Sequence, residues 1–376
     1  MSGRTYKVAT VVGTRPEIIK LSAVIRKMGE HFEHALVHTG QHYDYELSDI
    51  FFADFAISPP DVYLGASRGC PATAVGDIIS KSYSFFQSSK PDAILIYGDT
   101  NSALCAYAAK RLRIPIFHME AGNRCFDARV PEEVNRKLVD HLSDVNMTIS
   151  EQARDNLLRE GLRPDLTFKI GSSMPEVIQS VTSALTDTWL QRETAIPRIA
   201  TAEEGYYLVN IHREENVTNT LYMQVLMEVL KALDRPVILP AHPRMRKVFE
   251  NCASPFVKEK VHLCKPFGFI DYISLQKGAY CVISDSGSIM EEASLLRFPA
   301  ISIRDSHERP EGIETAGATI ASWSVDHILN SIHIARDNLK NVQPTPDYVF
   351  GGAVSAKVIN IINSYIEPVR KKVWSL

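Results

Sequence analysis

Short apolar runs alternate along the chain with longer segments whose apolar residues recur at helical spacing. Residues 8–12 form the first such run, and residues 16–28 follow with helical periodicity and a proline near their first turn. The same alternation predicts further strands at 35–38, 93–97, 114–118 and 145–149, and further helices at 102–112, 132–142 and 151–160. The runs are apolar throughout, which indicates strands covered by helices on both faces, as in a parallel α/β sheet.

The alternation breaks in the middle of the chain and then starts again. Residues 186–204 are polar and fit no core element, whereas a second series begins at Tyr206. This series predicts strands at 206–211, 237–239, 261–264, 281–284 and 300–303, and helices at 220–233, 270–279 and 289–296. We therefore predict an α/β protein with two Rossmann-like, doubly wound domains that face a cleft. The expected parts are a first domain at 1–175, a linker region at 176–205, a second domain at 206–355, and a C-terminal helix at 356–376 that crosses back to the first domain.

Charge and composition exclude several functional classes. The 376 residues carry a net charge of −3, which gives no electrostatic basis for binding nucleic acid or an anionic membrane. No segment reaches the roughly 18 uninterrupted apolar residues of a membrane span, and the N-terminus lacks the apolar core of a signal peptide. The six cysteines are scattered without metal-ligand spacing, which is typical of a reducing compartment. We expect a soluble, cytoplasmic protein.

The most informative stretch joins a predicted strand to a predicted helix near residue 286. Ser286, Gly287 and Ser288 form the turn that precedes the helix at 289–296. The free N–H groups at such a helix start, together with the positive end of its dipole, can bind a phosphate. Glu292 lies in the first turns of the helix, where its carboxylate can accept hydrogen bonds from two ribose hydroxyls. Taken alone, the stretch is equally consistent with an ordinary capped helix that bears solvated acids.

A second phosphate-binding motif follows the first predicted strand. Gly13 lets the backbone approach a ligand, and Arg15, with Lys20 about one turn further, can neutralise phosphate. The chain contains neither a GxGxxG motif nor a Walker A loop. We therefore expect neither a nicotinamide nor ATP as a cofactor.

Three carboxylates are predicted to converge at the strand ends of the first domain. Asp99 follows one strand, Glu120 follows the next, and Glu132 begins the helix after a short loop. Clustered carboxylates can divide acid and base roles among themselves. Each also has a structural alternative, since Asp99 is suited to cap a helix and Glu132 is a common first-turn acid after proline. His212, at a strand end of the second domain, is by itself more typical of a cleft-lining residue. The set favours catalysis, although no single member does.

Metal binding is the weaker alternative for these acids. Asp99 or Glu120 could hold magnesium together with substrate phosphates. No DxD pair is present, and we predict no bound metal.

The motifs together resemble the non-hydrolysing UDP-N-acetylglucosamine 2-epimerase family. The matching stretches run in order from residue 11 to about residue 312 and are VVGTRPEIIKLS, HTGQHYD, YGDTNS, HMEAGNR, PEEVNRKLVDHLSD, NIHREEN, SDSGSIMEEA and RDSHERPEG. The resemblance implies a two-domain fold of the glycosyltransferase-B type, usually a homodimer, with UDP in the interdomain cleft. It also implies acid and base roles for the three carboxylates and a position near the diphosphate for His212. The UDP contacts that it implies are Arg15, Ser286, Gly287, Ser288, Glu292 and Arg309.

The chain departs from the family pattern at four places. Glu214 stands in NIHREEN where the family commonly has a second arginine, and Ser288 stands where a second glycine is usual. Phe267 and Tyr272 flank the expected uracil pocket in KPFGFIDY, where the family commonly has other polar or aromatic residues. The loop EAGNRCFDARVPEE is shorter than in the N-acetylglucosamine enzymes.

The amino-acid sequences of this loop and of the stretches KPFGFIDY and HERPEG resemble those of one branch of the family. That branch converts UDP-2-acetamido-2,6-dideoxy-L-talose into UDP-N-acetyl-L-fucosamine for capsule or O-antigen polysaccharides. A shorter, less polar loop suits a 6-deoxy sugar because a C6 methyl group offers no hydroxyl to satisfy. The alternatives are an epimerase that makes UDP-N-acetylmannosamine from UDP-N-acetylglucosamine, a hydrolysing epimerase, a glycosyltransferase of similar fold, and a non-catalytic nucleotide-sugar sensor that could dispense with the acids.

Overall fold

The chain forms two compact units. The computed structural model describes residues 5–40, 52, 54–67, 69–182, 205–241, 243–315 and 317–375. The first unit comprises Met1–Ser180 and Asp347–Leu376, and the second comprises Val181–Pro346. Residues 183–204 of the predicted linker lie outside the described residues, as do residues 41–44 of the HTGQHYD motif.

The first unit is built on a parallel sheet whose described strands have the order β3-β2-β1-β4-β5-β6-β7. These strands are β1 (Lys7–Val12), β2 (Glu33–His38), β3 (Val62–Tyr63), β4 (Ala93–Tyr97), β5 (Ile116–Met119), β6 (Val145–Thr148) and β7 (Thr167–Lys169). The helices are α1 (Arg15–His31), α3 (Pro71–Ser89), α4 (Cys105–Arg111), α5 (Pro131–Leu142), α6 (Glu151–Arg159), α7 (Met174–Val181) and α17 (Val354–Trp374), with short 3₁₀ turns η1 (Asn101–Leu104) and η2 (Pro164–Leu166).

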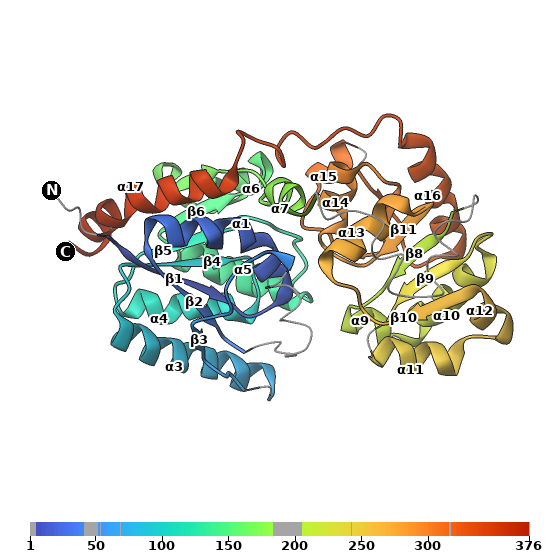
Figure 1. Cartoon of the computed structure of the whole chain (residues 1–376), viewed down its shortest axis with the longest axis horizontal. Helices are drawn as coiled ribbons and strands as arrows, with labels where there is room; N and C mark the ends of the chain where they lie inside the picture. Colours follow the sequence, from blue (N-terminus) through green and yellow to red (C-terminus); the bar gives the residue numbers. More distant parts are fainter. Residues whose placement is uncertain are drawn as a thin grey trace. The chain divides into compact units, whose positions relative to one another are not determined.

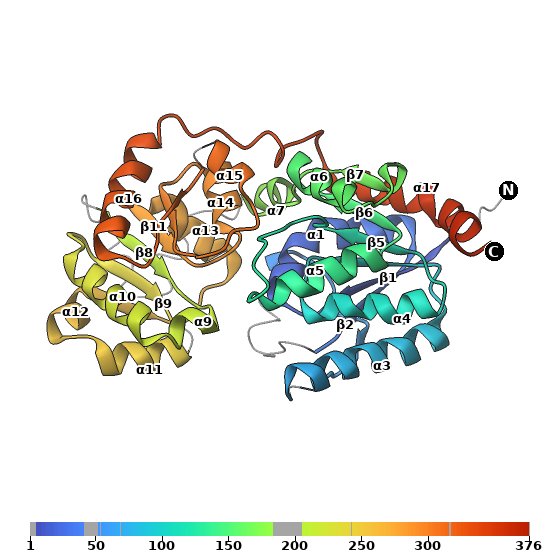
Figure 2. The same ribbon diagram turned by 180° about the vertical axis from the view of Figure 1, so that it is seen from behind.

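Helices cover both faces of this first sheet. Figures 1 and 2 show α1 and α17 together on one side of the sheet and α3 beside α4 on the other. The C-terminal helix α17 is tied to this unit by Arg370, whose Nη2 lies 2.6 Å from Oδ1 of Asp92. The residues of β4 are all buried, as expected for a strand between two helical layers.

The second unit repeats the architecture with the described strand order β10-β9-β8-β11-β12-β13, again entirely parallel. Its strands are β8 (Tyr207–Asn210), β9 (Val237–Pro240), β10 (Val261–Cys264), β11 (Cys281–Ser284), β12 (Ala300–Ser302) and β13 (Thr319–Ile320). Its helices are α9 (Glu214–Val217), α10 (Thr220–Ala232), α11 (Pro243–Cys252), α12 (Pro255–Lys260), α13 (Phe269–Gly278), α14 (Ile289–Leu296), α15 (Glu311–Glu314) and α16 (Val325–Asn338).

Two hydrophobic clusters lie on opposite faces of the second sheet. Successive residues of β11 divide between them, since Ile283 belongs to one cluster and Val282 to the other. The first cluster includes apolar residues of α10 and α16, and the other includes residues of α13 and α14. Strands that bury both faces in this way need apolar residues at every position, which explains the continuous apolar runs.

The predicted elements correspond closely to those of the structure. The predicted strands at 93–97, 261–264 and 281–284 have the observed bounds, and the predicted helix at 289–296 coincides with α14. The sequence pattern did not predict the helices α3, α7, α9, α11, α12, α15 and α16, or the strands β3, β7 and β13, which have two or three residues each. Such short strands carry too few residues for a detectable period.

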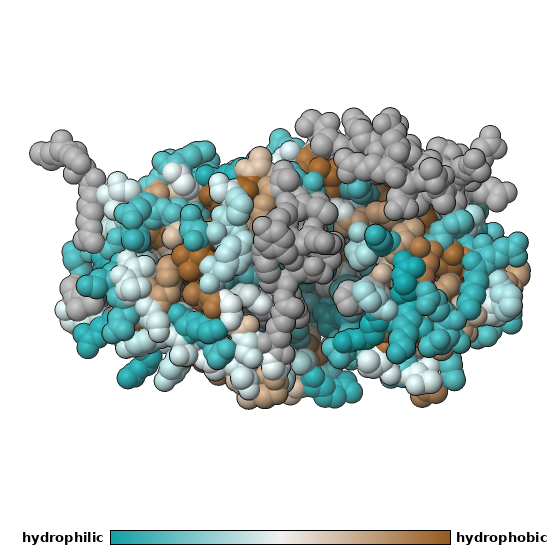
Figure 3. Space-filling view, turned by 60° about the horizontal axis from the view of Figure 1, so that its bottom comes forward, coloured by the Kyte–Doolittle hydropathy of each residue, from teal (hydrophilic) through white to brown (hydrophobic). Residues whose placement is uncertain are grey.

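Most large apolar side chains lie inside the two cores. On the face shown in Figure 3, polar side chains surround separate apolar patches. Exposed large apolar residues do occur on the helices, for example Tyr107 on α4 and Leu138 on α5. Among the described residues, no helix has the length and apolar character that crossing a membrane requires.

We predict that Gly122, just after β5, tolerates no side chain. Its φ angle is +82°, and a Cβ there would lie 2.2 Å from the carbonyl oxygen of Ala153. Gly161 is a matched control, because its φ angle is +86° but no heavy atom lies within 4 Å of the corresponding Cβ position. Gly122→Ala should lower stability by more than about 3 kcal/mol, and Gly161→Ala by about 1 kcal/mol from the left-handed backbone alone. Thermal melting followed by circular dichroism measures both, and equal shifts in the two variants would contradict the prediction.

Candidate active site

Three neighbouring strands of the first sheet end at the same edge. The sheet order places β1, β4 and β5 side by side, and they run parallel. Arg15, which is partly buried, follows β1, Asp99 follows β4, and Glu120 follows β5. The structure therefore brings these predicted site residues to the carboxyl edge of the sheet, where parallel α/β sheets bind their ligands.

Glu120 has an uncommon backbone conformation directly after β5. Its φ angle is +64°, in the left-handed region that costs a non-glycine residue about 1–3 kcal/mol. Its Oε2 atom accepts a hydrogen bond from Lys20 Nζ at 2.9 Å and another from the Tyr97 hydroxyl. Lys20 and Tyr97 are both buried. Backbone strain of this kind concentrates at functional sites, and these contacts help to hold it.

Asp99 is paired with Arg136 of α5. Its Oδ2 atom accepts hydrogen bonds from Nε and Nη2 of Arg136 at 3.0 and 2.7 Å. Nη1 of the same guanidinium donates to Oε2 of Glu133 at 2.8 Å. Glu133 also accepts hydrogen bonds from the backbone N–H groups of Cys125 and Phe126. Arg136 therefore connects Asp99 to the loop that precedes α5.

The two consecutive glutamates at the start of α5 have different surroundings. Burial alone would raise the pKa of Glu133, but the hydrogen bonds from Cys125 and the charge of Arg136 lower this pKa below its ordinary value. Glu132 is partly exposed, and within the described part of the chain its carboxylate forms no ion pair. The predicted acid Glu132 thus differs from its buried neighbour, whose carboxylate supports Arg136.

Glu17 is a buried carboxylate of this edge that the sequence reasoning missed. Its Oε2 atom accepts hydrogen bonds from the N–H groups of Gly13 and Thr14 at 2.6 and 2.8 Å, and its Oε1 atom accepts one from the Thr100 hydroxyl. Burial raises the pKa of Glu17 to about 7, although these hydrogen bonds oppose the rise. The spacing of Thr14 and Glu17 matches a helix capping box, which is the local signal that could have revealed it.

A second missed group is a buried network behind Asp99 and Glu120. His118 on β5 has Nε2 2.8 Å from the Gly98 carbonyl oxygen and Nδ1 3.0 Å from Oδ1 of Asp140. Burial disfavours the charged imidazole, but Asp140 and the Gly98 carbonyl outweigh it and raise the pKa of His118. Asp140 also accepts from Gly122 N–H and pairs with Arg124. The network holds the backbone at Gly98 and Gly122, which lie close in the chain to the predicted acids Asp99 and Glu120.

In the second unit, a buried aspartate orients His212 at the end of β8. Nδ1 of His212 lies 3.0 Å from Oδ1 of Asp285, which follows the adjacent strand β11. Burial alone would raise the pKa of Asp285, but His212, the Asn216 amide and the Arg213 N–H lower it below its usual value. The side chain of His212 is 49% exposed. The ring is therefore held from one side and remains accessible from the other.

The turn between β11 and α14 is closely packed. Ser286 Oγ lies 2.9 Å from Ser288 Oγ, so the serine that departs from the family pattern bonds within the turn. A Cβ at Gly287 would lie 2.8 Å from Oε1 of Glu308 and 3.2 Å from Nη1 of Arg304. Glycine at position 287 thus allows the close approach of this ion pair, whose nitrogen and oxygen lie 2.9 Å apart.

Polar side chains of α13 and α14 are joined by hydrogen bonds. Glu292 accepts a hydrogen bond from Gln276 Nε2 at 2.6 Å, and the Tyr272 hydroxyl accepts one from Asn210 at 2.9 Å. Burial, reinforced by the charge of Glu292, raises the pKa of Tyr272. Phe267 is partly buried and packs against the hydrophobic cluster that contains α13 and α14 residues.

Arg309, a predicted UDP contact, forms a buried ion pair. Its Nη1 lies 2.8 Å from Oε2 of Glu291, and the side chains are 3% and 0% exposed. The two adjacent acids of α14 therefore have separate partners, since Glu292 binds Gln276. The sequence singles out Glu291 with Glu292 as a pair of carboxylates but does not predict its partner, because only the folded chain brings residues 291 and 309 together.

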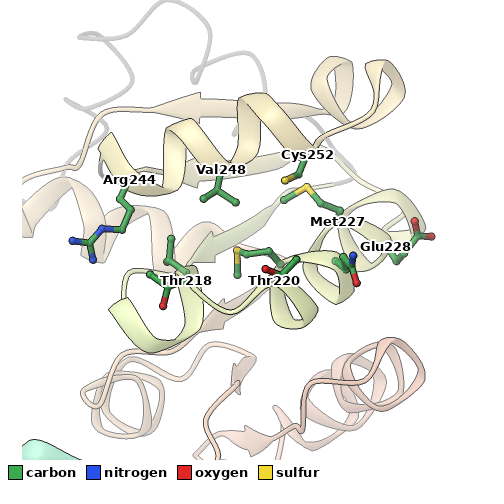
Figure 4. A pocket seen from close by; sticks show the side chains of 10 residues that line it. Thr218, Thr220, Met227, Glu228, Arg244, Val248 and Cys252 are labelled. Atoms are coloured by element: carbon green, nitrogen blue, oxygen red, sulfur yellow. The ribbon is translucent and has the colours of Figure 1, made fainter.

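The second unit also contains a groove. It lies between α10 and α11, has a volume of about 690 Å³, and is lined largely by apolar side chains such as Met227 and Val248 (Figure 4). None of the predicted site residues lines it. Among the described residues, no group of three or more His, Cys, Asp or Glu side chains is arranged to hold a metal ion.

Comparison with known proteins gives matches over nearly the whole chain. Residues 26–363 match the family described as UDP-N-acetylglucosamine 2-epimerase. A structure of UDP-N-acetylglucosamine 2-epimerase from Rickettsia bellii is 41% identical, with a TM-score of 0.89, and the match covers 99% of this chain and 100% of that one. A structure of the Methanocaldococcus jannaschii enzyme in complex with UDP-GlcNAc and UDP is 29% identical, with a TM-score of 0.82, covering 96% and 99% of the two chains. The UDP-2,3-diacetamido-2,3-dideoxy-D-glucuronate 2-epimerase of Pseudomonas aeruginosa is 33% identical over 359 residues, which are 94% of this chain and 98% of that protein.

The two doubly wound parallel α/β domains are shared with the Rickettsia bellii and Methanocaldococcus jannaschii epimerases. The chain belongs to the UDP-N-acetylglucosamine 2-epimerase family and is a non-hydrolysing nucleotide-sugar 2-epimerase. The predicted fold class of two Rossmann-like domains and the predicted class of enzyme are confirmed.

We predict that Glu17 makes stability fall as the pH rises from about 4.5 to about 7. The unfolded pKa is near 4.5 and the folded pKa is about 7, so in this window the folded chain retains a proton that the unfolded chain has lost. Stability should therefore decrease by up to about 3 kcal/mol across the window. Glu17→Gln should remove this decrease, because the amide mimics the protonated acid, donating to Thr100 and accepting from Gly13 and Thr14.

Urea unfolding at pH 5 and pH 8 measures the effect. The difference in the free energy of unfolding between the wild type and Glu17→Gln should change with pH. Glu30→Gln is the control, because Glu30 is exposed on the same helix. A Glu17→Gln difference that is the same at both pH values would contradict the prediction.

Proposed function

We propose that the protein inverts C2 of a UDP-2-acetamido sugar by eliminating UDP and adding it back. The observation that carries this proposal is the similarity, over 96% of the chain, to an enzyme whose structure holds UDP-GlcNAc and UDP. The carboxylates at the strand ends of the first unit, and the helix start after β11 in the second, are the groups that such a reaction requires.

C2 of the sugar is not bonded to a carbonyl carbon, so removal of its proton cannot give an enolate. A carboxylate instead removes the C2 proton while the bond between C1 and the UDP oxygen breaks. The electron pair of the C–H bond becomes the C1–C2 double bond of a 2-acetamidoglycal, and the pair of the broken C–O bond leaves with UDP. UDP then adds back to C1 while a proton is delivered to the opposite face of C2, which regenerates a UDP-sugar of inverted configuration.

The roles of the first unit follow from the need for proton transfer on two faces. We assign the acid and base roles to Asp99, Glu120 and Glu132. Asp99 and Glu120 are supported by their positions at adjacent strand ends, and Glu132 by a carboxylate that stays outside the ion pairs of the described α5 residues.

Most of the contacts to UDP in this proposal come from the second unit. Ser286, Gly287 and Ser288 present the start of α14, whose backbone N–H groups and dipole suit a phosphate. His212, together with Arg15, would stabilise the charge that develops on the departing diphosphate. Glu292 would bind the ribose. The contacts expected for Phe267, Tyr272 and Arg309, and the homodimer, remain predictions.

For the sugar, we propose UDP-2-acetamido-2,6-dideoxy-L-talose as substrate and UDP-N-acetyl-L-fucosamine as product. Support comes from the sequence of the loop between Glu120 and Glu132, which resembles that branch of the family. UDP-N-acetylglucosamine is the second candidate, because the Rickettsia bellii enzyme bearing that name is 41% identical to the chain.

Solvent exchange tests reaction and substrate together. We expect that incubation with UDP-N-acetyl-L-fucosamine in deuterated water places deuterium at C2 and produces the talose epimer, both visible by NMR. A parallel incubation with UDP-N-acetylglucosamine should show little exchange. Exchange in the second sugar alone would establish the second candidate. Exchange in neither sugar would contradict both candidate substrates.

The acid assignment is tested by isosteric variants. Asp99→Asn, Glu120→Gln and Glu132→Gln should each lower kcat about 100-fold or more, the usual contribution of a general acid or base. The affinity for UDP, measured by calorimetry, should change little. Glu30→Gln serves as the exposed control and should retain wild-type turnover. Near-normal kcat in all three variants would refute the assignment of the acid and base roles to these carboxylates.

A further inference from the structure

One oxygen of Glu120 receives two hydrogen bonds from different elements of the first unit. Lys20 of α1 donates from Nζ to Oε2 at 2.9 Å, and Tyr97 of β4 donates its hydroxyl hydrogen to the same atom. The Lys20 ammonium also lies 5.5 Å from the centre of the Tyr97 ring. The three side chains therefore form a single cluster of a cation, a phenol and a carboxylate.

The burial of this cluster gives it energetic weight. The side chains of Lys20 and Glu120 are 10% and 13% exposed, so their attraction is less screened than that of a surface pair. Buried charges of this kind are stable only when they are paired and hydrogen-bonded. Lys20 is thus engaged with the carboxylate of Glu120, whereas the sequence predicts that it neutralises a substrate phosphate.

The geometry of the two bonds determines where the other oxygen of Glu120 lies. With Oε2 held by Lys20 and Tyr97, Oε1 is directed toward Gly98, where a Cβ would lie 3.9 Å from it. Gly98 immediately precedes Asp99, and its φ angle is +66°. Oε1 is therefore positioned beside the backbone that leads into the second proposed acid.

We infer that Lys20 and Tyr97 are positioning residues for Glu120, which orient its carboxylate for proton transfer at C2, and that Lys20 is not a phosphate ligand. This inference rests on the proposed function. Oε1 of Glu120 exchanges a proton with C2 of the sugar, while Oε2 stays bonded to the ammonium and the phenol.

The two roles of Lys20 predict opposite kinetic effects. A positioning role predicts that Lys20→Met lowers kcat about 100-fold, as misplacement of a reacting group by about 1 Å can do, while KM and the Kd for UDP change less than about threefold. Tyr97→Phe should lower kcat about tenfold, again with little change in KM and in the Kd for UDP. Lys20→Arg, which keeps the positive charge, should recover part of the loss.

Matched controls separate this role from general packing. Lys110 is also paired with a buried aspartate, Asp144, and lies 5.3 Å from the centre of the Trp374 ring. The Tyr207 hydroxyl likewise donates to an aspartate, Asp234, at 3.0 Å. Lys110→Met and Tyr207→Phe should keep kcat within about twofold of the wild type, whatever their melting temperatures.

A double-variant cycle makes the test specific for Glu120. Because Lys20 acts through Glu120, Lys20→Met should lower kcat little further when Glu120→Gln is already present. Independent, multiplicative losses would overturn the inference. So would a tenfold or larger rise in KM and in the Kd for UDP with kcat retained, since that result identifies a phosphate ligand.

The wild-type enzyme distinguishes the failure of this inference from the failure of the proposed function. If the wild type exchanges the C2 proton but the Lys20 and Tyr97 variants keep their kcat, the positioning role is wrong and the epimerase remains. If the wild type shows no C2 exchange, the proposed function fails and the inference fails with it. Should Lys20→Met not fold, Tyr97→Phe, which retains the ammonium–carboxylate pair, decides the question alone.

Discussion

Burial of both faces of each parallel sheet is the constraint on which the rest of this protein depends. Helices cover the sheet of the first unit on both sides, and the two hydrophobic clusters of the second unit enclose its sheet in the same way. Interior strand positions are then occupied by apolar side chains, and polar chemistry concentrates where the strands end. Asp99, Glu120, His212 and Ser286 all lie within a few residues after a strand. The positions of the candidate site residues are therefore a consequence of how the sheets are covered.

Charged groups gathered at such edges are partly removed from water, and each needs a partner. Lys20 meets Glu120, Arg136 meets Asp99, and His212 meets Asp285. These pairs do more than neutralise charge, because each joins a strand end to a different element of the same unit. The left-handed backbone of Glu120 shows the result, since a strained residue is held beside groups from α1 and β4.

Family membership identifies the reaction more firmly than it identifies the sugar substrate. The Rickettsia bellii and Pseudomonas aeruginosa relatives are named for different UDP-sugars, yet each matches this chain over at least 94% of its length. The physical reason is that the proposed elimination and re-addition would involve C1, C2 and the diphosphate, which such sugars share. Selection among them depends on side chains that contact the rest of the ring. In this chain the loop between Glu120 and Glu132 is the segment we expect to make that selection.

The sequence by itself determined the order of strands and helices, because continuous apolar runs and helical spacing are local patterns. It also indicated the chemistry, since Asp99, Glu120 and Ser286 each follow an apolar run along the chain. Only the tertiary structure decided how these groups are paired. It showed that the adjacent Glu132 and Glu133 have different surroundings and that Arg309 pairs with Glu291. It also revealed the buried Glu17 and the His118–Asp140 network. It also placed Lys20 against Glu120, 100 residues away. Such pairings join residues distant in the chain, so no local pattern records them, and they follow from which strand ends the sheet order brings together.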